Sequence, residues 1–112
     1  MEPSPHNQLK LTELQETLHH WRTRNFPGGD AIEQLLGVQE EVGELSHAHL
    51  KELQGIRTNE NHYEEAQDAV GDIVIYLMGY CSYRNWNFEG ILDYVSDKVL
   101  ARDWQKDPVT GG

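Results

Sequence analysis

Apolar residues recur along most of this 112-residue chain at the three- and four-residue spacing of amphipathic helices. The predicted helices cover residues 8–24, 30–54 and 61–84, and a fourth begins at residue 87. The β-branched residues 73–75 could instead form a buried strand, but the helical pattern that continues on both sides favours a helix. No strand alternation or hairpin signal occurs elsewhere. Four helices with short connections predict an all-α, four-helix bundle-type fold.

Polar residues at the ends of these segments support the predicted boundaries. Asp30 and Asn87 are good N-caps, and Gly55 is a good helix stop. A chain of this length is expected to form one domain. We predict a disordered lead over residues 1–7, a single all-α domain over residues 8–105 and a flexible tail over residues 106–112.

Composition limits the classes of partner. Only 38% of the residues are apolar, so some apolar surface is expected to be buried between subunits. The net charge of −10 disfavours binding to a nucleic acid polymer, because the chain would repel a phosphate backbone. A small phosphorylated ligand remains compatible if metal ions bridge the like charges.

Cysteine usage and hydropathy point to a cytoplasmic protein. Cys81 is the only cysteine, which excludes an internal disulfide and predicts a small buried side chain. The N-terminal segment is polar and lacks the apolar core of a signal peptide. The longest apolar run, residues 73–81, is far shorter than the roughly 20 residues of a membrane span, so no membrane association is expected.

Two acidic clusters stand out within the predicted helices. Glu40, Glu41 and Glu44 lie in the second helix, and Asp68 and Asp72 lie in the third. Like charges three or four residues apart destabilise an isolated helix by about 0.2–0.5 kcal/mol per pair. A solvated helix face is the ordinary explanation. The alternative is a bound cation, and carboxylates at this density suit Mg²⁺, with Mn²⁺ as a substitute.

Neighbouring residues favour the second explanation. Gly43 lies among the acids although a glycine inside a helix costs about 1 kcal/mol relative to alanine, so we expect another backbone or a ligand to approach it closely. Asp72 has apolar helical neighbours and is expected at the edge of the core. Acids in that position are usually paired or bind metal.

The acidic motif Glu40-Glu41-x-x-Glu44, followed by Gly71-Asp72 and an apolar helical segment, resembles the MazG-like nucleoside triphosphate pyrophosphohydrolases. The resemblance extends from about residue 21 to residue 104. It implies an all-α fold and Mg²⁺-dependent hydrolysis of a nucleoside triphosphate to the monophosphate and pyrophosphate. It also implies a homodimer or homotetramer with sites near the subunit interfaces.

The resemblance assigns the metal ligands. Glu41 and Glu44 would be the ligands from the second helix, and Asp72 would be the ligand from the third. The family usually has glutamate three residues before that aspartate, where this chain has Ala69. Asp68 lies on the same face as Asp72 and is our candidate replacement. The alternative pairing of residues 65 and 68 matches the family spacing but leaves Gly71-Asp72 out of register.

The substrate-binding residues come from both ends of the chain. Lys98 and Arg102 resemble the family's phosphate-contacting segment, although pairing with neighbouring acids is an equal alternative. Trp21 and Phe26 lie where the family approaches the nucleotide base, and Trp21 also fits a core role. In this hypothesis Glu41 or Glu40 accepts a proton from the attacking water.

Two other functions stay open. One is a relative with a narrow substrate, such as a dUTP- or dCTP-type hydrolase or a phosphoribosyl-ATP pyrophosphohydrolase. The other is a non-catalytic helical module in which Ala69 has weakened the metal site.

Overall fold

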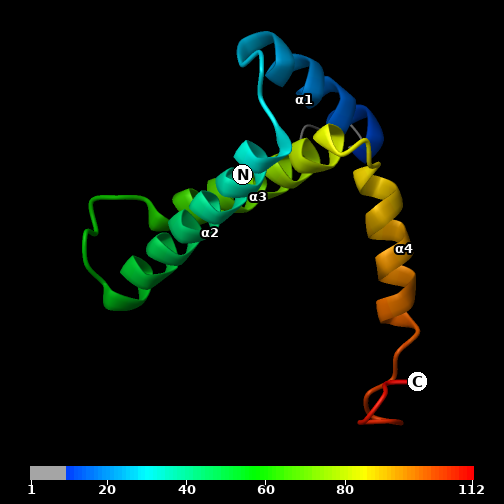
Figure 1. Ribbon diagram of the computed structural model, residues 1–112. Helices are drawn as coiled ribbons and strands as arrows, with labels where there is room; N and C mark the ends of the chain where they lie inside the picture. The colour runs from blue at the N-terminus through cyan, green and yellow to red at the C-terminus, as the bar shows by residue number, and fades with distance from the viewer. Residues whose placement is uncertain (1–9) are drawn as a thin grey trace.

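The computed structural model describes residues 10–112, and this part of the chain contains four α-helices and no strand, which confirms the predicted all-α fold (Figure 1). The helices are α1 (Leu11–Asn25), α2 (Ala31–Gln54), α3 (His62–Tyr83) and α4 (Phe88–Leu100). The predicted lead over residues 1–7 and the predicted start of the first helix at residue 8 lie outside the described residues.

Local capping explains where the helices begin and end. The side chains of Asp30, Asn61 and Asn87 each accept a hydrogen bond from the backbone N–H three residues further on, at the starts of α2, α3 and α4. Gly55 ends α2 with a left-handed φ of 66°, a conformation that glycine adopts without steric cost. The capping predictions at Asp30, Gly55 and Asn87 are therefore confirmed.

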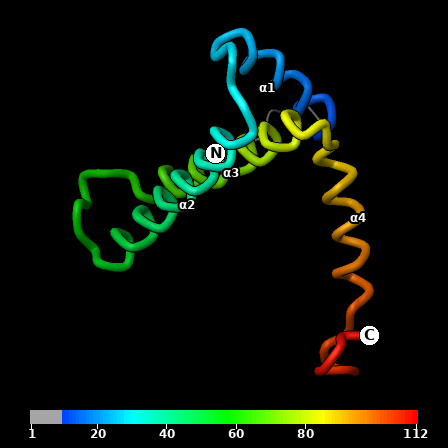
Figure 2. Tube along the Cα trace, in the orientation of Figure 1, coloured from blue at the N-terminus to red at the C-terminus, as the bar shows by residue number. Residues whose placement is uncertain are grey.

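The centre of the molecule is an antiparallel hairpin of α2 and α3, joined by the loop over residues 55–61 (Figure 2). Two glycines allow the helices to approach closely. Gly37 of α2 lies against the ring of Tyr76, and Gly79 of α3 lies against the side chain of Gln34. These two pairs define the register of the hairpin, because each turn forward along α2 meets one turn backward along α3.

A buried glutamine attaches α1 to the junction between α3 and α4. The Nε2 of Gln15 donates to the backbone carbonyl of Trp86 at 2.9 Å and to Ser82 Oγ at 3.1 Å. Its Oε1 accepts from the backbone N–H of Phe88 at 2.9 Å. Because both ends of the carboxamide have partners, this buried polar group carries no desolvation penalty from an unmade bond.

Large apolar side chains contribute little to the buried core. Its buried apolar residues in the described part of the chain are Ala48, Ala69, Met78 and Cys81, so the prediction for Cys81 is confirmed. Helix α4 buries no residue and extends away from the hairpin (Figure 1), and its apolar residues Ile91, Val95 and Val99 are exposed. Helices α2 and α3 contact each other largely through small residues, and several of their larger apolar side chains are exposed.

None of the helices in the described region is long and apolar enough to cross a membrane. The residues predicted as a flexible tail form a hydrogen-bonded turn, in which the Asp107 carboxylate accepts from the backbone N–H groups of Val109 and Thr110 and from the Thr110 hydroxyl. These hydrogen bonds, the Thr110 hydroxyl first, lower the pKa of Asp107.

Candidate functional site

A cavity of about 730 Å³ opens between α1, α2 and α3. This volume lies within the range of about 300–1,000 Å³ that is usual for small-molecule sites. Its walls combine aromatic rings, two carboxylates from facing helices and one arginine. The lining residues with aromatic, charged or amide side chains include Trp21, Arg22, Phe26, Gln34, Glu41 and Asp72.

Glu41 and Asp72 face the cavity from opposite sides of the hairpin. The register set by the pairs 34/79 and 37/76 places residue 41 opposite residue 72 one turn further along α2. Burial raises the pKa of Glu41, and the negative charges of Asp72, Glu40 and Glu44 raise it further. Carboxylates that repel each other in this way form a hard-oxygen donor set that fits Mg²⁺ or Mn²⁺.

The other predicted acids lie next to this pair but do not line the cavity. Glu40, Glu44 and Asp68 are exposed, and the next turn of the register places Glu44 opposite Ala69. Ala69 stands where the family resemblance implies a glutamate. It is only 2% exposed, so this position is buried beside α2. Within the part of the chain that the structure describes, no three of these acids bring their oxygens within 4.8 Å of one another.

The structure differs from two expectations about the acidic helices. A Cβ added at Gly43 would meet nothing within 4 Å, so no other backbone among residues 10–112 approaches it, and a ligand is the part of that expectation that stays a prediction; Gly37 and Gly79 are the glycines in close contact. Asp72 is exposed at the rim of the cavity rather than at the edge of the core. Both differences follow from the packing of α2 and α3, which runs through other positions of the two helices.

Arg22 is a candidate binding residue that the sequence analysis missed. It is only 5% exposed, and burial lowers its pKa, yet guanidinium groups stay charged at neutral pH. Its nearest polar partners are long contacts of 3.5 Å to the Ile75 carbonyl and to His19 Nδ1. No carboxylate among residues 10–112 lies within 4.0 Å of it. Its position four residues after Leu18 puts this arginine in line with the apolar face of α1, and that position could have indicated that it is buried.

A second buried polar group accompanies this arginine. The Oε1 atom of Gln34, which lines the same cavity, is buried without a hydrogen-bond partner. Buried polar atoms that lack a partner are uncommon, and they often mark a place where a ligand or water completes the bonding. Within the described chain, the cavity therefore offers one cation without a carboxylate partner and one acceptor without a hydrogen bond.

The two predicted aromatic residues lie together on the cavity wall. The rings of Trp21 and Phe26 meet edge to face, with centroids 5.8 Å apart and an interplanar angle of 73°. Trp21 is 48% exposed and Phe26 is 59% exposed, so neither is buried in the core. Exposed aromatic faces at the mouth of a cavity are suitable surfaces for stacking a planar ligand.

Lys98 and Arg102 lie away from the cavity. Both are exposed, one on α4 and the other just after it, and neither lines the cavity of its own chain. The ammonium group of Lys98 lies 5.2 Å from the centre of the Tyr94 ring. The alternative of pairing with Asp97 or Asp103 does not occur within 4.0 Å in the described chain.

Comparison of the chain with models of protein families, with curated proteins and with solved structures finds no match.

Proposed function

We propose that this protein is a pyrophosphohydrolase that converts a nucleoside or deoxynucleoside triphosphate to the monophosphate and pyrophosphate. The observation that carries the proposal is the cavity in which Glu41 and Asp72 face each other beside two aromatic rings and a buried, unpaired arginine. A nucleoside triphosphate requires carboxylates that hold its metal ion, aromatic rings that stack on its base and a positively charged side chain that binds its phosphate oxygens. The residue pattern that resembles the MazG-like family gives the same assignment.

Glu41 and Asp72 would hold Mg²⁺, with Glu44 and Asp68 as additional ligands from the neighbouring turns. Bound Mg²⁺ supplies the positive charge that lets a chain of net charge −10 bind a triphosphate, and it acidifies water. The charge repulsion that raises the pKa of Glu41 supports this assignment, because a cation would relieve it.

The remaining residues bind and orient the substrate. Trp21 and Phe26 would stack on the base, and Arg22 would donate to phosphate oxygens from the inner wall of the cavity. Glu41 would also accept the proton of the attacking water, through a carboxylate oxygen that does not hold the ion, because it lines the cavity in which that water would lie. Glu40, the alternative acceptor, is exposed outside the cavity.

The active form would contain more than one copy of the chain. Its radius of gyration is 17.5 Å, whereas a compact chain of this length has a value of about 13 Å. Its accessible surface is 8710 Å², against about 6,300 Å² for a compact monomer of this mass. The difference, about 2,400 Å², is more than the roughly 800 Å² that each partner buries in a stable interface.

We place that interface on the exposed apolar side of α4. A second copy covering Ile91, Val95 and Val99 would complete the helical bundle. It would also provide a route by which Lys98 and Arg102 reach the cavity of the other subunit, as the family resemblance implies. The proposed setting is the cytoplasm, where the enzyme would act on the nucleotide pool.

The deciding experiment measures pyrophosphate release from a panel of ribo- and deoxyribonucleoside triphosphates, with Mg²⁺ and with EDTA. Release that requires Mg²⁺ and stops with EDTA is expected. Activity confined to one base or sugar would identify a narrow-substrate relative. A folded protein that releases pyrophosphate from none of the panel, and whose melting temperature Mg²⁺ does not raise, would contradict the proposal and favour the non-catalytic module.

A further inference from the structure

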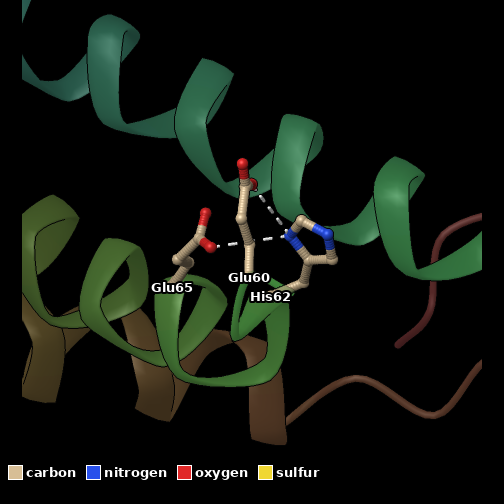
Figure 3. Close-up of side chains that lie close together, drawn as sticks. All are labelled: Glu60, His62 and Glu65. Carbon is tan, nitrogen blue, oxygen red and sulfur yellow. Dashed lines mark ion pairs between the residues drawn. The ribbon is translucent and has the colours of Figure 1, made fainter. Parts of the chain in front are cut away.

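A second group of metal-ligating side chains lies at the opposite end of the hairpin, where the loop enters α3. Glu60 belongs to the loop, His62 is the first residue of α3, and Glu65 follows one turn later (Figure 3). One ligand atom from each of the three residues lies within 4.8 Å of the others. In the described chain this is the only such group of three.

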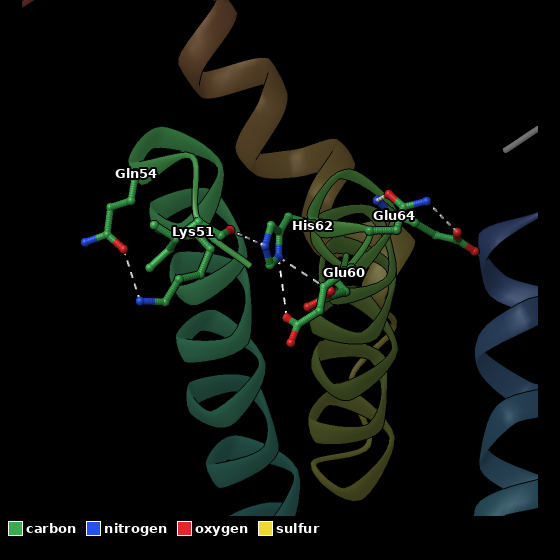
Figure 4. Close-up of polar contacts among 8 residues, drawn as sticks. Lys51, Gln54, Glu60, His62 and Glu64 are labelled. Carbon is green, nitrogen blue, oxygen red and sulfur yellow. Dashed lines mark hydrogen bonds and ion pairs between the residues drawn. The ribbon is translucent and has the colours of Figure 1, made fainter. Parts of the chain in front are cut away.

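The imidazole of His62 is buried and held in one orientation. The residue is only 6% exposed, and its Nε2 lies 3.2 Å from the backbone carbonyl of Ile56 (Figure 4). A carbonyl oxygen can only accept, so Nε2 carries the proton and donates it. In the neutral ring the lone pair is then on Nδ1, which points toward Glu60 and Glu65 (Figure 3).

The Nδ1 atom has no hydrogen-bond partner although it is buried. It lies 3.5 Å from Glu65 Oε1 and 3.9 Å from Glu60 Oε2. Both distances exceed the roughly 2.7–2.9 Å of a charged hydrogen bond between a protonated ring and a carboxylate. The shorter distance is close to the separation of about 3.3 Å between two ligands that each lie about 2.0 Å from a tetrahedral zinc ion, and the longer one exceeds it by about half an ångström. Small side-chain movements of the two exposed glutamates would bring all three groups onto one ion.

We propose that Glu60, His62 and Glu65 form a binding site for a divalent transition-metal ion of the zinc type. One imidazole and two carboxylates suit Zn²⁺, whereas Mg²⁺ and Ca²⁺ prefer ligand sets made of oxygen alone. The Ile56 carbonyl fixes the tautomer through the far ring nitrogen, which is the usual arrangement behind a metal-bound histidine.

The ion would fasten the loop to the first turn of α3. Glu60 lies before the helix and Glu65 within it, so a shared ion restrains the connection between α2 and α3. Three protein ligands leave a fourth position open. A cavity of about 520 Å³ lined by Glu60, His62 and Lys51 adjoins the cluster and gives that position access to water. The site is separate from the acids of the proposed pyrophosphohydrolase centre and does not depend on it.

The test is a Zn²⁺ titration of metal-free full-length protein in excess Mg²⁺, with a chromogenic chelator as competitor. One Zn²⁺ per chain is expected. Glu65→Gln and Glu60→Gln should each weaken Zn²⁺ binding about tenfold or more, since loss of even an outer partner of a ligand costs about 10–100-fold. The matched control is Glu64→Gln, which makes the same charge change in the same turn. Its carboxylate lies 3.1 Å from Asn61 Nδ2 and is not part of the cluster (Figure 4).

A second measurement distinguishes Zn²⁺ binding at His62 from binding at the other histidines of the chain. Long-range ¹H–¹⁵N spectra of the imidazole rings should show Zn²⁺ shifting Nδ1 of His62 while its Nε2 stays protonated. Binding that shifts only other histidines would overturn the proposal. So would Zn²⁺ affinity that is equal in the wild type and all three variants, or no binding at micromolar Zn²⁺.

Discussion

Glu41 of α2 and Asp72 of α3 face each other across the hairpin, and the charge of Asp72 contributes to the raised pKa of Glu41. Burial is the larger cause, and Glu40 and Glu44 add to it from the same helix. The packing of α2 on α3 holds the two carboxylates close enough to repel each other, and a bound cation would offset that repulsion. The first two predictions use this relationship.

Replacing either member of the pair by its amide should abolish pyrophosphate release. We expect both variants to lower the rate at least about 100-fold, because Glu41→Gln removes the proposed general base and Asp72→Asn removes a proposed metal ligand. Helical content should stay unchanged, because the amides preserve shape and relieve repulsion. Pyrophosphate assays together with circular dichroism would measure both effects. Glu52→Gln, an exposed acid further along α2, is the control; wild-type rates in both cavity variants would contradict the assignment.

Stability without divalent metal should depend on pH through Glu41. Its folded pKa lies above the ordinary value of 4.5, so between the two values the native state binds more protons than the unfolded state. This contribution therefore falls as pH rises through that window. The melting temperature of wild type relative to Glu41→Gln should decrease as pH rises from about 4 to 7. Arg22 lines the same cavity and stays charged throughout. A difference that does not change with pH would count against this interpretation.

Arg22 should lower the stability of the fold or leave it unchanged, and it should strengthen substrate binding. Arg22→Met keeps the aliphatic length and removes a buried, unpaired charge, so the free energy of unfolding should stay the same or increase. Loss of a charged hydrogen bond to phosphate should weaken substrate binding by about 1.5–3 kcal/mol. Denaturant unfolding and KM measure the two effects separately. Arg24→Met, at an exposed arginine of α1, should change neither, and an unchanged KM for Arg22→Met would exclude the proposed phosphate contact.

The exposed side of α4 should hold two copies together. Val95→Asp places a charge on its apolar face and should convert an oligomer to monomers, measured by light scattering during gel filtration. Asp93→Ala, a change at an exposed polar position of the same helix, should leave the mass unchanged. If the wild type is already monomeric at micromolar concentration, the interface proposed for α4 is wrong.

Two glycines should respond in opposite ways to alanine. A Cβ at Gly79 would lie 2.8 Å from the Arg22 guanidinium carbon and would overlap Gln34, so Gly79→Ala should destabilise the fold by about 1–3 kcal/mol. Gly43 is helical and has open space around it, so Gly43→Ala should stabilise by about 0.4–1 kcal/mol. Chemical denaturation compares the two. A destabilised Gly43→Ala variant would show that a partner or ligand approaches that position after all.

Much of the fold could be predicted because its signals are local. The caps at Asp30 and Asn87 and the left-handed turn at Gly55 depend on residues within one helical turn, and all three lie where the sequence placed them. The residues of the predicted site do not all lie in one place. Glu41, Asp72, Trp21 and Phe26 share one cavity, whereas Lys98 and Arg102 lie elsewhere, because the direction of α4 depends on distant contacts that no local pattern encodes.

By itself the sequence determined that the chain forms four helices, where the second begins and ends, where the fourth begins, and which helices carry the acids, because helix periodicity and capping act over three or four residues. The tertiary structure decided which residues meet. The hairpin register, set where α2 and α3 pack closely at Gly37 and Gly79, places Glu41 against Asp72. The packing of α1 against α3 buries Arg22 without a carboxylate partner among residues 10–112, and the contact of His62 Nε2 with the Ile56 carbonyl turns Nδ1 toward Glu60 and Glu65. These side-chain contacts depend on the packing of the folded chain, which no pattern of apolar residues specifies.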